Sequence, residues 1–205
     1  VNSNGDTFVA WCWKANGGTT SSNTDGSVTS TVQANTKAGF SIVTATAPSS
    51  GVFTVGHGLN AEIDLYIIKS LSTGGWVTYV RDLGADKYLR LDTNDAAGTS
   101  TNFWDNTNPT SSVFTMKAGS VIVGTANFVA YCFKSIDGFS KIGSYEGNGT
   151  TTGPMVETGF EPAFILIKDV DGSDNWALVD NKRATTNPRQ TWLRPNLNNA
   201  EFTNT

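Results

Sequence analysis

The sequence is poor in charge: only 16% of its 205 residues are charged, and the net charge is −4. It has no run of lysine and arginine, which argues against a nucleic-acid-binding surface. It also has no apolar run near the roughly 18 residues of a membrane-spanning helix, so we expect no membrane insertion. Residues 1–6 (VNSNGD) lack a basic head followed by an apolar block, so no signal peptide is visible.

Residues that favour helices are also scarce, and threonine, serine, asparagine and glycine fill most polar positions. Threonine suits strands, whereas glycine and asparagine suit turns. We therefore predict an all-β chain of tandem antiparallel β-sandwich units (jelly-roll, concanavalin-like or immunoglobulin-like), with less than roughly 10% helix. The expected strands are Phe40–Thr46, Val52–Val55, Asp64–Lys69, Trp76–Arg81, Lys87–Leu91, Val113–Met116 and Asn127–Lys134.

There are only two cysteines and one histidine. Cys12 lies in TFVAWCWK (Thr7–Lys14) and Cys132 in NFVAYCFK (Asn127–Lys134), both dense apolar segments. We expect both thiols to be free and buried in central strands, the alternatives being a disulfide or a metal site. His57 is flanked by glycines and has no Gly-x-Ser-x-Gly motif to accompany it, so we interpret it as a polar loop residue rather than a catalytic base.

The two cysteine segments are part of an internal repeat. Strand DLYIIK matches AFILIK, Trp76 matches Trp176, and Leu89-Arg90 matches Leu193-Arg194. GFSIV (39–43) also matches GFSKI (138–142). The repeat predicts three parts, namely a closing strand of an upstream unit plus a Gly/Ser/Thr/Asn-rich linker (1–37), a complete unit (38–134) and a second unit that lacks its last strand (135–205).

The missing strand of the second unit must be supplied from somewhere, because a sheet without a central strand leaves apolar faces exposed to water. Three sources are open. Residues beyond 205 supply it if the chain is a fragment, or Thr7–Lys14 of the same chain folds back, or Thr7–Lys14 of a neighbouring chain inserts. The neighbours of Thr7–Lys14 in the structure distinguish these possibilities.

The repeated motifs resemble a tandem β domain found in tail-fibre-like and other appendage proteins of marine tailed bacteriophages. The match lies in FVAWCWK, AGFSIVT, VGHGL and DLYIIK, and again in NFVAYCFKSIDGFSKIGS and PAFILIK. The resemblance implies a virion appendage and gives no catalytic residues. We therefore expect other virion proteins and copies of this chain as partners, and a location on the virion surface.

One acidic pair resembles part of a glycosidase motif. Concanavalin-like glucanases carry three carboxylates on one strand, and Glu62 and Asp64 would supply two of them. Tyr66 and Ile67 occupy the positions open to the third. A glycosidase is therefore the least favoured hypothesis, and we predict no enzymatic activity.

Two groups of residues are candidates for ligands. Asp169, Asp171 and Asp174 resemble a calcium loop, with a hairpin turn as the alternative, so the expected cofactors are none, or calcium. Trp104, Asp105 and Asn106, taken as an exposed ring beside polar side chains, are typical of glycan binding, and Tyr145 and Trp192 are weaker candidates. The alternative is that these rings close the edges of the sandwich. The sequence thus predicts a structural module of a phage appendage, or a carbohydrate-binding adhesin that recognises glycans of the host surface.

Overall fold

The computed structural model describes residues 4–5 and 7–203. It is mostly β, with 33% strand and 4% helix, which confirms the all-β prediction and the low helix content. The helical segments among these residues are the 3-10 turn η1 (Arg81–Leu83) and α1 (Thr101–Trp104). Neither has the length and apolar character needed to cross a membrane.

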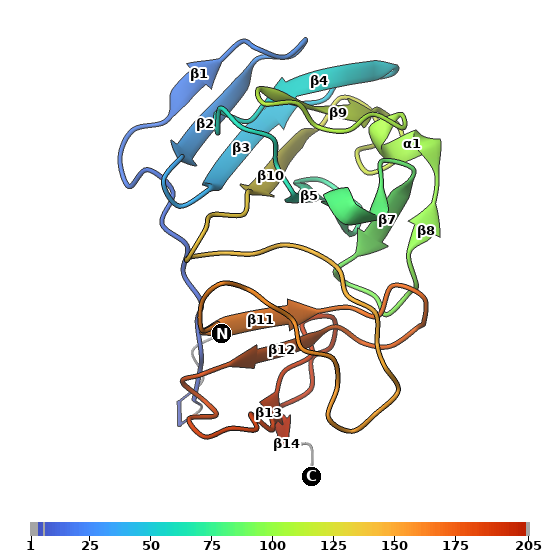
Figure 1. Ribbon diagram of the computed structural model, residues 1–205. Coiled ribbons are helices and arrows are strands. Elements are labelled where there is room, and N and C mark those ends of the chain that lie inside the picture. Colours follow the sequence, from blue (N-terminus) through green and yellow to red (C-terminus); the bar gives the residue numbers. More distant parts are fainter. Residues whose placement is uncertain (1–3, 6, 204–205) are drawn as a thin grey trace.

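Most strands belong to one antiparallel sheet of eight (Figure 1). Its members in chain order are β1 (Ser21–Asn23), β2 (Ser30–Asn35), β3 (Phe40–Thr46), β5 (Leu65–Ser70), β6 (Trp76–Val80), β7 (Lys87–Arg90), β8 (Gly98–Thr99) and β10 (Asn127–Phe133). Their order in space is β1-β2-β3-β10-β5-β6-β7-β8, so β10 arrives late in the chain and inserts between β3 and β5. We call residues 21–134 the large-sheet region.

Strand β10 is central, as its two apolar faces predict. Phe128, Ala130 and Cys132 on one face are fully buried. On the other face, Tyr131 stacks on Trp76 with ring centroids 6.2 Å apart, and Phe133 lies 4.9 Å from Phe40. The strand is therefore paired along both edges and fully buried on one face, while Tyr131 and Phe133 on the other face are half-buried.

A two-stranded ribbon packs on the first of these faces. It consists of β4 (Val52–Gly56) and β9 (Val113–Lys117), which pair antiparallel. Phe53 of the ribbon contacts Phe128 at 6.3 Å between ring centroids, and Phe114 contacts Tyr66 at 4.9 Å. The apolar core of the protein lies between the ribbon and the large sheet.

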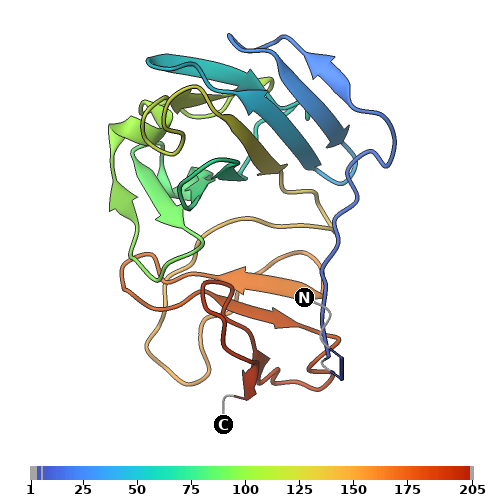
Figure 2. The ribbon, with the colours of Figure 1, turned by 180° about the vertical axis from the view of Figure 1, so that it is seen from behind.

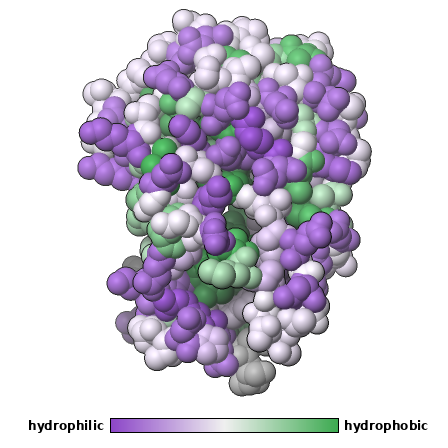
Figure 3. All heavy atoms as spheres, viewed as in Figure 1, coloured by the Kyte–Doolittle hydropathy of each residue, from purple (hydrophilic) through white to green (hydrophobic). Residues whose placement is uncertain are grey.

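Residues 135–203 form the hairpin region, which lies beneath the large sheet in Figures 1 and 2. It contains two hairpins, β11 (Phe164–Ile167) with β12 (Ala177–Asp180) and β13 (Thr191–Trp192) with β14 (Phe202–Thr203). A bridge between Leu178 and Leu193 joins them. Figure 3 shows apolar surface midway up the molecule, between the two regions, on a face that is otherwise largely hydrophilic.

The hairpins β5–β6 and β11–β12 have the same register under the alignment of the repeat. Leu65 pairs with Val80 in the first, and the aligned Phe164 pairs with Asp180 in the second. The next strand also repeats, because Thr78 pairs with Leu89 just as Leu178 pairs with Leu193. A side-chain hydrogen bond is repeated as well. Lys69 donates to the Gly74 carbonyl in the turn of the first hairpin, and the aligned Lys168 donates to the Gly172 carbonyl in the turn of the second.

The hairpin region is attached to the β7–β8 side of the large sheet by three hydrogen bonds. The indole N–H of Trp176 donates to the Arg90 carbonyl at 2.8 Å. The Ala97 amide donates to the Val170 carbonyl at 2.8 Å, and the Asn94 side chain donates to the Ser173 carbonyl at 2.7 Å. These bonds fix the turn between β11 and β12 against the β7–β8 edge of the large sheet.

Two predictions about strands are wrong. Thr7–Lys14 is not a β-strand, and Cys12 within it is exposed, whereas Cys132 is buried in β10 as predicted. Both thiols are free. GFSKI (138–142) forms a turn closed by a bridge between Ile136 and Ser140 instead of a strand like β3. One physical reason explains both outcomes. Strand β3 pairs with β10, so the aligned segments GFSKI and Thr7–Lys14 would have to pair with each other. A strand without such a partner leaves its backbone hydrogen-bonding groups unpaired.

Candidate functional site

Trp104, the leading glycan candidate, is fully buried, so the prediction of an exposed ring is wrong. The hydroxyl of Ser100 caps α1 by accepting a hydrogen bond from the Asn102 amide at 3.1 Å. The short helix turns Phe103 and Trp104 inward, and the Trp104 indole donates to the Lys87 carbonyl at 2.9 Å. The apolar pair in a polar loop anchors that loop to the core.

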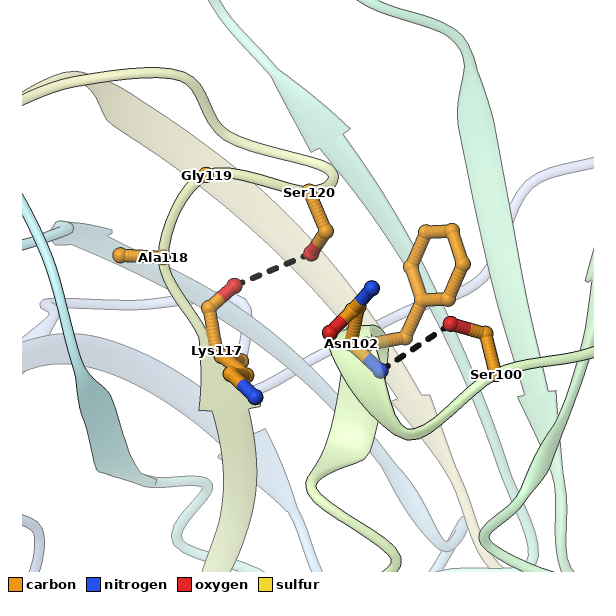
Figure 4. A pocket seen from close by; sticks show the side chains of 7 residues that line it. Ser100, Asn102, Lys117, Ala118, Gly119 and Ser120 are labelled. Carbon is orange, nitrogen blue, oxygen red and sulfur yellow. Dashed lines mark hydrogen bonds between the residues drawn. The ribbon is translucent and has the colours of Figure 1, made fainter.

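An open hollow of about 380 Å³ lies beside α1 (Figure 4). Its lining is Ser100, Asn102, Phe103, Lys117, Ala118, Gly119 and Ser120. The Ser120 hydroxyl donates to the Lys117 carbonyl at 3.0 Å, and the ammonium of Lys117 lies 3.8 Å from the carboxylate of Asp105. Asn106 is exposed nearby in sequence. With Phe103 buried, this hollow presents polar groups but no open aromatic face.

A second open hollow, of about 260 Å³, lies in the hairpin region. It is lined by Asp174, Asn175, Trp176, Ala177, Trp192, Arg194 and Phe202, and we call it the Trp192 hollow. The structure here brings together Trp192 and Asp174, which the sequence analysis had assigned to two different candidate sites. Strand β13, its partner β14 and the turn before β12 supply the walls.

The Trp192 hollow combines aromatic and charged groups. The rings of Trp192 and Phe202 are 6.4 Å apart and both half-buried. The guanidinium of Arg194 lies 4.6 Å from the centroid of Phe202, and Asp174 contributes an exposed carboxylate. Half-open rings beside a carboxylate, an amide and a guanidinium suit a ligand with one apolar face and a rim of hydroxyls, such as a sugar ring.

The three calcium candidates are used in different ways in the structure. Asp169 accepts hydrogen bonds from the amides of Asp171 and Gly172 at 3.0 and 3.1 Å, so its carboxylate closes the turn. Asp174 lines the Trp192 hollow instead. Within residues 4–5 and 7–203, no three His, Cys, Asp or Glu side chains are grouped to hold a metal ion. The hairpin-turn alternative describes this loop.

The acidic pair of the glycosidase hypothesis is held by an arginine. The guanidinium of Arg81 lies 3.1 Å from Glu62 and 3.3 Å from Asp64, and it also donates to the Ile63 carbonyl. The other oxygen of Asp64 accepts from the Ser135 amide at 2.8 Å. These contacts pin the start of β5 to η1 and to the chain leaving β10.

His57 is fully buried, which its position between two glycines did not predict. Its Nε2 lies 3.2 Å from the Thr110 carbonyl, and its Nδ1 accepts from the Leu59 amide. One nitrogen donates and the other accepts, so the ring is neutral, and burial lowers its pKa below 6.5. The ring joins two loops of the core and lines neither of the two hollows described above. Tyr145 is 51% exposed and lines neither hollow.

The comparisons with known proteins place the chain in a family. A family model described as Domain of unknown function (DUF7483) matches residues 1–205. The chain belongs to this family. The DUF7483 match spans Thr7–Lys14, the large-sheet region and the hairpin region alike. Comparisons with curated proteins and with solved structures gave no significant match.

Sequence reasoning missed five members of the Trp192 hollow in this DUF7483 chain, namely Asn175, Trp176, Ala177, Arg194 and Phe202. Residues 175–177 precede or begin β12, whereas Arg194 and Phe202 come 17 or more residues later, so no local pattern connects the two groups. The repeat did carry one signal. It aligned Leu193-Arg194 with Leu89-Arg90, which places Arg194 beside the β12 strand and therefore near the residues before it.

Proposed function

We propose that this chain is a non-enzymatic structural and interaction module of a bacteriophage virion appendage, either a tail fibre or a capsid-associated fibre. The observation that carries the proposal is the shared register of β5–β6 and β11–β12. Two copies of one hairpin plan in a single chain fit tandem units, and the sequence resembles appendage proteins built from such units. Modules in series set the reach of a fibre.

In this proposal each unit is a β-sandwich. The ribbon β4–β9 is the second layer of the first unit, since it covers the face of the large sheet that carries Tyr66 and Phe128. The hairpin region is the second unit, with fewer strands. The partners are other virion proteins and copies of the chain, on the virion surface.

The acid pair supports a structural role over a catalytic one. Arg81 forms ion pairs with Glu62 and Asp64, and Asp64 also accepts a backbone amide, so both carboxylates are used in holding the fold. Tyr66, at one of the positions open to a third carboxylate, is fully buried in the core. A retaining mechanism needs an acid and a nucleophile flanking an open site.

The test is to locate the protein on virions. Purified particles of the phage that encodes the chain are digested and analysed by mass spectrometry, and antibody against the chain is imaged by immunogold electron microscopy. We expect peptides from the chain in the particles and gold on a fibre or its base. Peptides confined to the infected-cell lysate, with none in the particles, would exclude the proposal.

A second candidate function, carbohydrate binding, is favoured by the Trp192 hollow. A half-exposed indole, Arg194 and Asp174 converge there, as in sites that hold a sugar ring by stacking and hydrogen bonds. A glycan array on the intact chain should show saturable binding that Trp192→Ala abolishes. Phe139→Ala is the matched control, because Phe139 is 60% exposed but outside the hollow. Equal binding by both variants would show that the hollow is not the site.

A further inference from the structure

The Trp192 hollow contains an arginine that forms no ion pair with the part of the chain that the structure describes. Arg81, Arg183 and Arg189 lie 3.1, 2.6 and 3.5 Å from carboxylates. By contrast, no carboxylate of residues 4–5 and 7–203 lies within 4.0 Å of the Arg194 guanidinium. Arg194 is half-buried, so its charge is partly removed from water without a protein anion to balance it.

The surroundings of Arg194 leave its hydrogen-bond donors available. Its guanidinium carbon lies over the Phe202 ring, 4.6 Å from the centroid. The ring attracts the positive charge without using an N–H group. None of the described residues accepts a hydrogen bond from the Arg194 side chain. The planar fork of donors, which matches the two oxygens of a carboxylate, is therefore free for a ligand.

The walls around this arginine are tied together by hydrogen bonds. The side-chain amide of Asn196 donates to the Asn175 oxygen at 2.7 Å and accepts from the Trp176 backbone amide at 3.2 Å. The Trp192 indole N–H donates to the Arg189 carbonyl at 3.2 Å. Asn175 keeps its own N–H groups as donors, because its oxygen is the atom in use. The rings and polar groups of the hollow are thus held in place before a ligand arrives, which lowers the entropic cost of binding.

The acidic residue of the hollow does not neutralise Arg194. Asp174 is exposed, and its charge acts on Lys168. Burial lowers the pKa of Lys168, and the carboxylates of Asp169, Asp174 and Asp95 oppose that effect. The hollow therefore offers a cation and a carboxylate acceptor in separate places. A ligand with one carboxylate and several hydroxyls uses both, because its anion pairs with the guanidinium and a hydroxyl donates to Asp174.

We propose that the Trp192 hollow binds acidic sugars, with the carboxylate of the sugar on Arg194 and the apolar face of its ring on Trp192. This inference rests on the carbohydrate-binding function proposed for the hollow, and it names the class of sugar. The chain carries a net charge of −4, so it repels anionic glycans in general. A preference for acidic sugars must therefore come from a local cation, and Arg194 is the arginine that lines the hollow.

The test compares each acidic glycan with its own methyl ester. The intact chain is applied to an array of neutral glycans and of glycans that end in uronic or sialic acids, the latter printed both as free acids and as methyl esters. The ester keeps the ring and hydroxyls but loses the charge. Free acids should bind about tenfold more tightly, because the ester loses a charge-assisted pair. Equal binding of acid and ester would overturn the acidic-sugar inference and leave carbohydrate binding standing. Binding to no glycan at all would overturn both.

Variants assign the preference to one side chain. Arg194→Gln should weaken binding of the acids about tenfold and change binding of the esters by less than about twofold. Arg194→Lys keeps the charge without the fork and should retain part of the preference. Since the esters still bind, a loss confined to the acids cannot come from unfolding.

Arg90→Gln is the matched control. Arg90 is aligned with Arg194 in the repeat and lies over the Tyr88 ring at 5.8 Å, but it lines neither hollow. The preference for acids should be unchanged in this variant. A preference that survives in Arg194→Gln, or that is lost equally in Arg90→Gln, would overturn the assignment to the Trp192 hollow.

Discussion

The two hairpins β5–β6 and β11–β12 share a register but differ in what surrounds them. In the large-sheet region, Tyr66 and Ile68 of β5 are fully buried under the ribbon β4–β9. In the hairpin region, the aligned Ile165 is 39% exposed and Ile167 half-buried. Hairpin pairing is local, since it needs only a turn and two strands, whereas a core needs strands from far along the chain.

The clearest contrast is between the two thiols, Cys132 in the large-sheet region and Cys12 in the N-terminal segment that precedes it. Burial raises the pKa of Cys132 to about 12, and its side chain has no exposed surface, while Cys12 is exposed. A thiol reagent at pH 8 should label Cys12 at once and Cys132 at least about a thousandfold more slowly, because Cys132 reacts only through unfolding. Denatured protein should present both. Prompt labelling of both thiols in the native protein would show that the large-sheet region opens readily around Cys132.

Aligned isoleucines test the difference in packing directly. Ile68→Ala removes a fully buried side chain from the core and should lower the free energy of unfolding by about 3–4 kcal/mol. Ile167→Ala makes the same chemical change at the aligned position, where the side chain is half-buried, and should cost about 1 kcal/mol. Urea unfolding of both variants measures this. Equal costs would mean that the second sheet is as well packed as the first.

These aligned positions show what the sequence could predict. The strands themselves were predictable, because alternation and turn residues act over a few positions, so DLYIIK and AFILIK predicted matching strands. Burial depended on distant partners. Trp104 was predicted to be exposed because its neighbours Asp105 and Asn106 are polar. Its ring is instead buried against Tyr66 and Tyr79, which are far away in the sequence and could not be inferred from the loop. Cys12 looked buried because TFVAWCWK resembles β10. However, β10 is paired by β3 and β5 and covered by the ribbon β4–β9, and Thr7–Lys14 pairs with no strand among the described residues.

Lowering the pH should destabilise the two regions over different pH ranges, because one titratable residue acts in each: His57 in the large-sheet region and Asp180 in the hairpin region. Burial lowers the pKa of His57, so the unfolded chain takes up a proton more readily below pH 6.5. The free energy of unfolding of the large-sheet region should therefore fall as pH drops from 6.5 through the lower folded-state pKa. His57→Gln, which keeps a donor toward Thr110, should remove this slope. A slope unchanged in the variant would assign it to another group.

Asp180 controls a more acidic window in the hairpin region. Burial alone would raise its pKa, but hydrogen bonds from the Arg183 amide, the Arg183 guanidinium and the Lys182 amide together lower it below 3.8. Its stabilisation is present above pH 3.8 and is lost as pH falls through the folded-state pKa. Region-resolved hydrogen exchange should show this loss in wild type and not in Asp180→Asn. Loss above pH 5 would contradict it.

Surface ion pairs should not distinguish the regions. Glu62 is 65% exposed in its pair with Arg81, and Glu161 is 84% exposed in its pair with Arg189. Glu62→Gln and Glu161→Gln should each change the free energy of unfolding by less than about 0.5 kcal/mol in urea titrations, because exposed pairs are screened by water. A loss of more than about 1 kcal/mol of unfolding free energy in either variant would show that surface ion pairs contribute to the difference in stability between the regions.

The bonds of Trp176, Ala97 and Asn94 to the opposite region have a mechanical consequence. They lie on the β7–β8 side, while the chain crosses between the regions at Ser135 and again beyond Lys14, where Asn35 donates to the Lys14 carbonyl. Two bodies held at several separated points cannot swing about one hinge. Force applied across the two regions is shared among these attachments, so the two regions should resist bending as one stiff body.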